Sequence, residues 1–410
     1  MMERIGVELE EAVEIITEHT GFLEAAEEID LGEALGRVAA ESYKSHMDNP
    51  PFDRSPLDGY AFRSQDVREA GNSCPIGLTV TQVLYAGGWY DREVGPLEAV
   101  RIMTGAPIPP GADCVIRQEE VSFRAGEKDT LWIPRPMKPY ENYCFQGEDS
   151  QKGTMLLEKG EAIGYVEQGI LASAGINRVK VYRKPRIAFF VAGDELCPPG
   201  QPLKPGKIYD SNYWLLSGRM KALGYPPAVS GMAGDHPEEI AGELCRIIDQ
   251  TDLVITTGGV SVGEKDIFHQ VLPLLGARRL FWRVKMKPGT PAMFALYKGK
   301  PMIHLSGNPF AAAATFELLA VPALKKLTAA PHLTQRRQKA VLTRDFEKAG
   351  GRRFVRGYVE DGMVTLPPAA SHASGMLFSM KGCNCLADLP PSETPIRAGQ
   401  EVEVIRFPSL

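Results

Sequence analysis

The spacing of apolar positions changes along the chain and predicts several kinds of region. Residues 7–17 carry apolar side chains at helical spacing, so an amphipathic helix is expected there. A second short helical run is expected at residues 31–40, with Asp30 as its N-cap. Between residues 78 and 153, short apolar runs alternate with turn residues, which predicts a β-rich lobe with strands at 78–85, 99–103, 114–116 and 130–133.

From residue 187 onward, apolar strands and amphipathic helices alternate at the spacing of βαβ units. Strands are expected at 187–191, 229–232, 253–257 and 301–304, and helices at 213–223, 237–248, 267–275 and 309–327. This alternation predicts a parallel sheet in a three-layer αβα domain, with the basic segment 183–186 as its boundary. Beyond residue 330, a small β-barrel or sandwich is predicted from short strands at 340–343, 354–358, 363–366, 384–389 and 401–407.

Composition narrows the class of protein. The 410 residues, 44% hydrophobic and 24% charged, are typical of a soluble globular chain that is too long for one ordinary core. A net charge of -5 gives no support for a nucleic-acid or acidic-membrane partner, so neither is expected. No apolar run approaches about 18 residues and no signal-peptide pattern is present, so a cytoplasmic location is expected. The seven cysteines contain no C-x-x-C pair, and the histidines show no i, i+4 pair, which favours reduced thiols and no zinc site.

The loop after the strand at 253–257 is the strongest candidate for ligand binding. Gly258 and Gly259 permit a sharp turn, and small residues up to Gly263 let backbone N–H groups approach a phosphate at the carboxyl edge of the sheet. Asp266 would repel that phosphate unless a cation bridged them, which suggests Mg²⁺. The same glycines would also suit an ordinary tight turn, and the sequence leaves both interpretations open.

Further charged residues follow neighbouring strands at the same predicted edge. Glu195 and Asp235 each come after a strand, so one site could collect them together with Asp266. Carboxylates gathered beside a phosphate loop must be neutralised by metal or by lysine. Lys287, before Pro288 and Gly289, supplies such a charge, although it could also be an ordinary solvated surface lysine.

Two loops of the β-rich lobe also carry residues typical of ligand sites. The segment 49–62 presents Asp53, Ser55 and Asp58 between prolines and an Asp-Gly turn, a density of charge that a plain turn does not need. Thr104 stands beside a glycine turn and a rigid proline-rich loop. Ordinary surface turns use the same residue types, so each of these loops is a weak signal by itself.

Six motifs, taken in order, resemble the molybdopterin molybdenumtransferase (MoeA-type) family, which includes the E domain of gephyrin. They lie at residues 55–61, 102–106, 193–196, 257–263, 287–289 and 307–309. The resemblance implies a homodimer with a shared active site, built from four-part protomers of multidomain α/β plus β fold. Two of the implied parts are discontinuous β-rich lobes, at 1–26 with 46–149 and at 27–45 with 150–183. The other two are a molybdopterin-binding αβα domain at 184–330 and a carboxyl-terminal β-barrel at 331–410.

The reaction that this resemblance implies inserts molybdate, a substrate, into adenylylated molybdopterin with Mg²⁺-assisted release of AMP. The adenylyltransferase of the preceding step is a further candidate partner. The resemblance implies catalytic roles for Asp266, Asp235, Glu195, Asp58, Thr104 and Lys287. Asp266 and Asp235 would hold Mg²⁺. Asp58 and Thr104 would come from the partner protomer. Molybdopterin or nucleotide would be bound by Gly258, Gly259, Ser261, Gly263, Ser211, Asn212 and Pro309. Molybdate would be bound by Lys287, Ser374 and Arg352.

The chain departs from the family pattern at several positions that are usually occupied otherwise. Thr290 replaces a usual lysine, Ser306 a usual proline, and Cys144, Phe145 and Gln146 replace basic residues. Because each good contact to an anion is worth about 1.5–3 kcal/mol, these losses predict reduced molybdate affinity. They also keep open a non-catalytic molybdopterin-binding or scaffold paralogue, and the α/β domain keeps open a molybdopterin adenylyltransferase. The sequence does not distinguish molybdate from tungstate or identify the recipient apo-enzymes.

Overall fold

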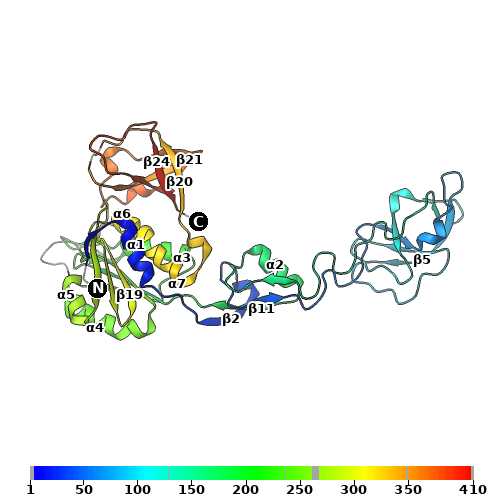
Figure 1. Ribbon diagram of the computed structural model, residues 1–410, viewed down its shortest axis with the longest axis horizontal. Coiled ribbons are helices and arrows are strands. Elements are labelled where there is room, and N and C mark those ends of the chain that lie inside the picture. Colours follow the sequence, from blue (N-terminus) through cyan, green and yellow to red (C-terminus); the bar gives the residue numbers. More distant parts are fainter. Residues whose placement is uncertain (1–3, 128, 235, 261–266, 348–349, 408–410) are drawn as a thin grey trace. The chain divides into compact units, whose positions relative to one another are not determined.

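The computed structural model describes residues 4–127, 129–234, 236–260, 267–347 and 350–407 (Figure 1). The chain forms two compact units. The first contains Met1–Glu28, Gly36–Ala40 and Lys180–Leu410, and the second contains Ile29–Leu35 and Glu41–Val179. The chain passes between the units four times: within β2 (Ala26–Asp30), between residues 35 and 36, between residues 40 and 41, and within β11 (Arg178–Tyr182).

A mixed sheet, of seven strands among the described residues, forms the centre of the first unit. Its order is β1 (Arg4–Val7), β17 (Arg278–Val284), β18 (Met293–Tyr297), β19 (Lys300–Leu305), β16 (Leu253–Thr257), β12 (Ile187–Ala192) and β15 (Val229–Ala233). β18 runs antiparallel to both of its neighbours, so the expectation of an entirely parallel sheet is wrong. The reason is local: β18 and β19 are joined by the two-residue turn Lys298-Gly299, both at positive φ, and not by a crossover helix.

Helices cover both faces of this sheet, which confirms the three-layer αβα prediction. One face is covered by α4 (Pro237–Ile247) and α5 (Phe268–Leu275). The other is covered by α1 (Leu9–Glu18), α3 (Asn212–Ala222), α6 (Pro309–Thr315) and α7 (Val321–Thr328), the last two joined by the π-helical turn Phe316–Ala320. Neighbouring residues of β12 enter opposite cores, Phe189 on the α1 side and Phe190 on the α4 side, because successive strand side chains point to opposite faces.

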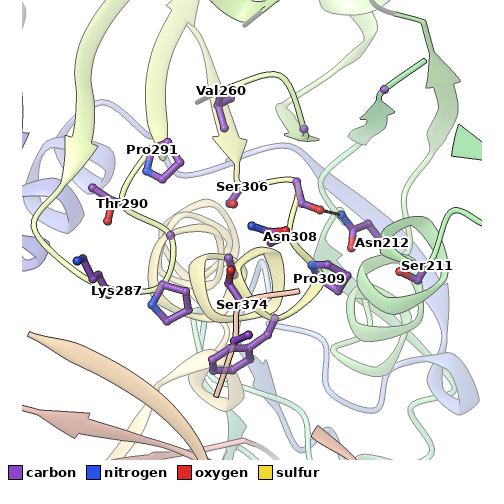
Figure 2. A pocket seen from close by; sticks show the side chains of 18 of the residues that line it. Ser211, Asn212, Val260, Lys287, Thr290, Pro291, Ser306, Asn308, Pro309 and Ser374 are labelled. Carbon is purple, nitrogen blue, oxygen red and sulfur yellow. Dashed lines mark hydrogen bonds between the residues drawn. The ribbon is translucent and has the colours of Figure 1, made fainter. Parts of the chain in front are cut away.

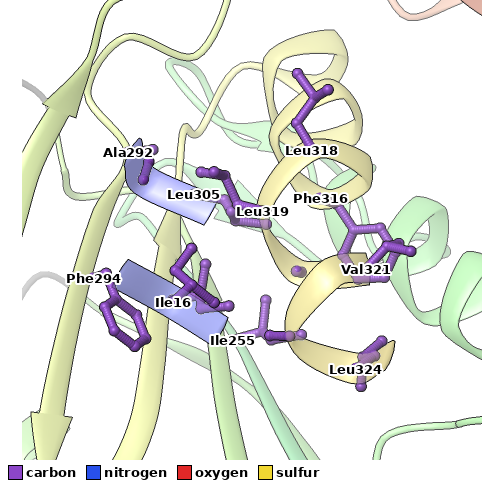
Figure 3. Packing of buried hydrophobic residues seen from close by; sticks show 14 of the residues in the cluster. Ile16, Ile255, Ala292, Phe294, Leu305, Phe316, Leu318, Leu319, Val321 and Leu324 are labelled. Carbon is purple, nitrogen blue, oxygen red and sulfur yellow. The ribbon is translucent and has the colours of Figure 1, made fainter. Parts of the chain in front are cut away.

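The amino-terminal helix belongs to this α/β unit, which corrects the assignment of residues 1–26 to the β-rich lobe. β1 pairs in parallel with β17, and α1 packs against α7. Figure 3 shows Ile16 of α1 among Ile255, Phe294 and Leu324, in the apolar core between sheet and helices. Helical spacing predicts α1 itself. It does not say which apolar surface the helix will cover, since any such surface can accept an amphipathic face.

A closed barrel forms the rest of the first unit, as predicted for the carboxyl-terminal region. Its strand order is β20 (Arg336–Leu342), β22 (Met363–Thr365), β21 (Arg353–Glu360), β23 (Cys385–Leu389) and β24 (Glu401–Arg406). Val355 and Val404 point into the barrel's own core, whereas Phe354 and Ile405 join the core of the α/β domain. The barrel and the α/β domain therefore share one apolar interface.

The second unit is β-rich, as expected. Its main sheet has the order β7 (Cys114–Arg117), β4 (Gly59–Phe62), β6 (Glu98–Ile102), β5 (Ile76–Leu84), β9 (Thr130–Ile133) and β8 (Ser122–Phe123). A smaller part contains β3 (Tyr43–Lys44) paired with β10 (Met155–Leu157), and α2 (Tyr165–Ser173).

The helix expected at residues 31–40 is wrong. Only Leu31–Glu33 forms a single 3₁₀ turn, because Gly36 at φ +76° interrupts any helix and Ala39 bridges to Val181 instead. Across the described parts of the chain, no helix is both long enough and apolar enough to cross a bilayer.

Candidate functional site

A cavity of about 770 Å³ lies between the carboxyl ends of three sheet strands and the barrel. The loops that follow β12, β16 and β19 line it, as sequence reasoning predicted for the edge of an α/β sheet. From the barrel, residues of β21 and of the segment 372–374 complete the wall. The cavity brings together these predicted site residues: Glu195, Ser211, Asn212, Gly258, Gly259, Lys287, Pro309 and Ser374.

The other predicted site residues are placed elsewhere. Asp58 and Thr104 belong to the second unit. Arg352 does not line the cavity. Four of the predicted site residues lie outside the described residues: Asp235, Ser261, Gly263 and Asp266. The convergence of Asp235 and Asp266 with Glu195 therefore stays a prediction.

The glycine turn after β16 has a structural reason for its composition. Gly258 has φ +93°, and a Cβ there would lie 2.2 Å from the carbonyl oxygen of Ala192. Gly259 has φ +63°, and its Cβ would lie 2.4 Å from Cγ2 of Ile267. The tight-turn interpretation therefore accounts for both glycines. Their backbone also lines the cavity, so the turn and a phosphate contact are compatible.

The start of α3 provides a polar wall. Asp210 accepts a hydrogen bond from the backbone N–H of Tyr213 at 3.0 Å, and burial raises the pKa of its carboxyl group. Asn212 donates from Nδ2 to the carbonyl of Gly307 at 2.7 Å (Figure 2) and to Oγ1 of Thr257 at 3.1 Å. Its Oδ1 is buried and has no hydrogen-bond partner among the described residues. A ligand that carries an N–H donor would satisfy this oxygen.

Lys287 lies on the opposite wall, in a turn that is fixed against the barrel. Its backbone N–H donates to the carbonyl of Arg352 at 3.0 Å, and its own carbonyl accepts from the N–H of Phe354 at 2.8 Å. Figure 2 shows Lys287 across the cavity from Ser211 and Asn212. The residue lines the cavity and its side chain is exposed, so the ligand-binding and surface-lysine interpretations are both compatible with its position.

Arg356 on β21 is a cavity-lining cation that sequence reasoning missed. Its side chain is fully buried, with the guanidinium 3.9 Å from the ring centroid of Phe310. It donates to the carbonyls of Ser371 and Ala373, the latter at 3.0 Å, whereas its Nε and Nη1 have no partner among the described residues. Burial lowers its pKa. A buried guanidinium with open donors fits an oxyanion, because charge-assisted hydrogen bonds are strong in such surroundings.

Arg352, which the sequence assigned to molybdate, is instead bound within the fold. Its Nε and Nη2 donate to Asp388 at 2.8 and 2.6 Å, and its Nη1 donates to Glu10 at 2.7 Å. These carboxylates raise its pKa. The alternation of β21 could have shown that Phe354 and Arg356 share a face. Only the packing of the barrel decides that this face meets the cavity.

The charges of the cavity are unevenly distributed. The barrel and the Lys287 turn contribute Lys287, Arg353 and Arg356, whereas the loops after β12 and before α3 contribute Glu195 and Asp210. Among the described residues, no group of three or more His, Cys, Asp and Glu side chains is arranged to hold a metal. Two carboxylates are nevertheless the oxygen donors that Mg²⁺ prefers when substrate phosphates complete its shell.

Two departures from the family pattern line this cavity, and both are bonded internally. Oγ1 of Thr290 donates to the carbonyl of Met286 at 2.6 Å, so its hydroxyl closes the turn that carries Lys287. The carbonyl of Ser306 accepts from Oγ1 of Thr257 at 2.7 Å. Thr290 brings no positive charge in place of the usual lysine, whereas Ser306 stands in place of an uncharged proline.

In the second unit, the predicted ligand loop is held mainly by its own hydrogen bonds. Asp53 accepts from the hydroxyl of Tyr143 at 2.6 Å and from the N–H of Gln146 at 2.7 Å, and Ser55 is 1% exposed. Asp58 is different, because Oδ1 accepts from both the N–H and the hydroxyl of Thr104, each at 2.7 Å. The backbone hydrogen bond from Thr104, with its hydroxyl bond, lowers the pKa of this exposed carboxyl group. The pair therefore presents an ionised carboxylate.

Three family models match consecutive ranges of the chain. Residues 7–175 match the MoeA N-terminal region (domain I and II). Residues 188–326 match the probable molybdopterin binding domain, and residues 339–407 match the MoeA C-terminal region (domain IV). The second of these matched ranges contains the glycine turn, Asn212 and Lys287, and the third contains Arg356.

Full-length relatives and solved structures cover nearly the whole chain. A molybdopterin molybdenumtransferase from Nostoc sp. is 35% identical over 93% of this chain and 88% of its own, and one from Bacillus subtilis is 34% identical over 98% and 94%. Two crystal structures of the molybdopterin biosynthesis MoeA protein from Pyrococcus horikoshii superpose with TM-scores of 0.83 and 0.80, at 32% and 30% identity. They cover 99% and 98% of this chain, and 100% of each of theirs. This chain belongs to the molybdopterin molybdenumtransferase family.

Proposed function

We propose that this protein inserts molybdate into adenylylated molybdopterin and releases AMP. The observation that carries the proposal is one cavity with two chemically different walls. A glycine turn and the amide of Asn212 line it together with Lys287, Arg356 and Ser374, and Lys287 lies across it from Asn212 (Figure 2). Such a cavity suits a ligand pair made of a polar heterocycle with phosphates and a separate oxyanion.

Molybdate, a tetrahedral dianion, would bind at the cationic wall. The open Nε and Nη1 donors of Arg356 and the ammonium group of Lys287 supply charge-assisted hydrogen bonds, and the hydroxyl of Ser374 adds a neutral donor. The backbone carbonyl of Ser374 accepts from the N–H of Phe310 at 3.0 Å, which fixes this segment against α6. A buried guanidinium attracts an anion more strongly than an exposed one because water screens it less.

Adenylylated molybdopterin would occupy the other wall. The backbone of Gly258 and Gly259 approaches its phosphates, and the amino-terminal end of α3 adds a favourable dipole. Oδ1 of Asn212, buried and without a partner among the described residues, would accept an N–H of the pterin. This places the substrate's reacting end toward Lys287 and Arg356.

Mg²⁺ fits the oxygen donors of this wall. Glu195 and Asp210 would hold it, with Asp235 and Asp266 as the further ligands expected from the sequence. When bound, the ion would neutralise the negative charge of the phosphate linkage that is cleaved. Asp210 already carries a raised pKa because it is buried, so a nearby cation would favour its ionised form.

A homodimer would complete the site. By the family resemblance, Asp58 and Thr104 of the partner subunit enter the cavity of the first. The two hydrogen bonds from Thr104 hold the Asp58 carboxylate ionised, which suits a group that orients a water molecule or a metal-bound phosphate.

Purified protein supplied with adenylylated molybdopterin, Mg²⁺ and molybdate should release AMP and yield a cofactor that activates an apo-enzyme. Release should require all three components. Binding of the pterin without AMP release would instead favour the scaffold alternative. Incorporation of AMP from ATP into molybdopterin would favour the adenylyltransferase.

A further inference from the structure

Another cavity of the first unit, of about 720 Å³, shares no lining residue with the cavity around Lys287. Its walls come from α3, from α6 with the π-helical turn that follows, from residues 331–336 and from the barrel segments 380–384 and 406–407, and it is called the α3–barrel cavity below. The volume lies within the range of small-molecule sites, about 300–1,000 Å³. None of its residues has a role in the proposed reaction, so the α3–barrel cavity is a separate candidate site.

Much of the wall of the α3–barrel cavity is apolar. Leu216 of α3 and Phe316 of the π-helical turn belong to the buried core of the α/β domain, and Met380 and Phe407 pack against that core from the barrel. Ala313 of α6 lines the cavity with a short side chain and is only partly buried. An apolar group bound against these side chains would be removed from water, which favours binding.

The acidic residue of the α3–barrel cavity is Glu317, and the fold already compensates its charge. Glu317 is 7% exposed and accepts hydrogen bonds from Nε of Arg219 at 2.6 Å and from Nη2 at 3.2 Å. Asn384 is also bonded within the fold, because its Nδ2 donates to the carbonyl of Val359 at 2.9 Å and its Oδ1 accepts from the N–H of Val359 at 2.7 Å. Among the described lining residues no other carboxylate is present, so the cavity has no acidic group left to neutralise a further cation.

Two further cations, Arg336 and Arg406, line the α3–barrel cavity from the barrel, and both are exposed. They are directly opposed residues of the antiparallel strands β20 and β24, and the Cβ atoms of such pairs lie about 5 Å apart. Arg406 donates from Nη2 to the carbonyl of Val359 at 3.1 Å, and neither arginine has a carboxylate partner among the described residues. Because like charges in this position repel each other, an anion bound beside them would be attracted by both.

We propose that the α3–barrel cavity binds an amphipathic organic anion, with its charged group at Arg336 and Arg406 and its apolar body against Leu216, Phe316 and Met380. The charges and the apolar wall together select this class of ligand. A neutral apolar ligand would leave the two arginines uncompensated, and a small inorganic anion would leave the apolar side chains in contact with water. The inference does not depend on the proposed function, since the two cavities have no lining residue in common.

The test uses anilinonaphthalene sulfonate, an aromatic body with one sulfonate, and phenylnaphthylamine, which has the same body without the charge. Binding of both probes is followed by the rise in their fluorescence in apolar surroundings. The wild-type protein should bind the sulfonate about five-fold more tightly than the neutral probe, because only the sulfonate can engage the arginines. Equal affinities, or tighter binding of the neutral probe, would overturn the proposal.

Variants test the two parts of the cavity separately. Arg336→Ala should weaken binding of the sulfonate about five-fold and leave binding of the neutral probe unchanged, and Arg336→Lys should recover part of the loss. The matched control is Arg344→Ala, because Arg344 is an exposed arginine of the barrel domain that does not line this cavity. Equal weakening in Arg344→Ala would show a general charge effect and overturn the proposal.

Ala313→Phe tests the apolar part, because an aromatic ring at this position would occupy the space of the ligand. A folded Ala313→Phe protein, checked by thermal unfolding, should bind neither probe. Undiminished binding by the folded variant would overturn the proposal. If this variant does not fold, the variants of Arg336 still decide, since that side chain is exposed.

The free thiol of Cys383 shows where the probe binds. Cys383 lines the α3–barrel cavity, is partly buried and donates from Sγ to the carbonyl of Ser379 at 3.3 Å, whereas Cys74 is exposed and belongs to the second unit. Saturating anilinonaphthalene sulfonate should slow the reaction of Cys383 with a maleimide and leave that of Cys74 unchanged, as measured by mass spectrometry of the labelled peptides. Bound probe without protection of Cys383 would place the ligand elsewhere and overturn the proposal.

Discussion

Two arginines four residues apart, Arg352 and Arg356, occupy opposite electrostatic situations. Arg352 is clamped by Asp388 and Glu10, and its pKa is raised. Arg356 is more deeply buried, contacts carbonyls and the ring of Phe310, and has a lowered pKa because burial removes water without a carboxylate in return. The first charge is neutralised inside the fold, and the second has no acidic partner among the described residues.

The difference separates a charge that serves stability from one without an acidic partner among the described residues, within five residues at the start of β21. Burying an unpaired charge costs free energy, so a fold keeps such a group only where something else, often a substrate, compensates. A buried charge that is paired gives no such indication of a substrate, since the ion pair with its partner already compensates its burial. The partner atoms around each arginine are thus a better guide to function than its burial.

The largest expected effect is on stability, in Arg352→Met. The variant leaves Asp388, which is 8% exposed, without its bidentate partner. We expect a loss of about 3 kcal/mol in the free energy of unfolding, the lower end for a broken buried ion pair, because Arg337 still approaches Asp388 at 3.8 Å. Denaturant unfolding measures it.

In the folded Arg352→Met protein, the KM for molybdate should equal that of the wild type. The double variant Arg352→Met with Asp388→Leu is the control, because removing both partners should recover much of the stability. A raised KM for molybdate with unchanged stability would reverse the comparison and support the molybdate-binding role that the family resemblance implies for Arg352.

Arg356→Met should show the opposite signature. Because a buried cation is replaced by an apolar side chain of similar length, stability should change by no more than about 1 kcal/mol. Loss of a buried charge-assisted contact to the oxyanion should lower molybdate insertion about 100-fold. AMP release and thermal unfolding, measured on one preparation, give both values. A strongly destabilised variant with full activity would show that Arg356 serves the fold.

The smallest expected effect is on the pH dependence of stability, and it concerns Glu10, which accepts a hydrogen bond from Arg352. Burial is the largest influence on Glu10 and opposes its ionisation, but the hydrogen bond and charge of Arg352, a backbone hydrogen bond and the charge of Arg337 together outweigh it, so the pKa is lowered from 4.5. A lowered carboxyl pKa adds stability above pH 4.5 that is lost as the pH falls through the folded value. The side chain is 65% exposed, so the contribution is below about 1 kcal/mol.

The stability difference between wild type and Glu10→Gln should therefore be small at pH 7 and vanish in acid. Chemical unfolding at several pH values between 3 and 7 would measure it. The same difference at pH 3 and pH 7 would mean that Glu10 acts through packing and not through its charge.

The spacing of apolar residues predicted the elements correctly where each face of an element meets a single kind of surroundings, either apolar core or solvent. The alternation from residue 187 to 330 predicted the αβα layers, and the short strands beyond predicted the barrel. The same patterns failed where a short connection or a single glycine decides the local structure. The turn Lys298-Gly299 makes β18 antiparallel, and Gly36 prevents the expected helix.

The candidate site was predicted where its residues follow strands in the chain. Glu195, the glycine turn and Lys287 were found in this way, and all line one cavity. Arg356 was missed because its signal, an arginine in an apolar strand, says nothing about which neighbour the strand will face.

The sequence by itself predicted β12, β15, β16 and β19, the helices between residues 212 and 328, and the loops that reach the carboxyl edge of the sheet, because these follow from the period of apolar positions and from turn residues, whereas β1, β17 and β18 were not predicted. Only the tertiary structure decided that α1 covers the α/β sheet, that Arg352 meets Asp388 and Glu10, and that Arg356 meets the cavity. The physical reason is that pairing and burial depend on contacts between segments far apart in the chain, which local spacing does not encode.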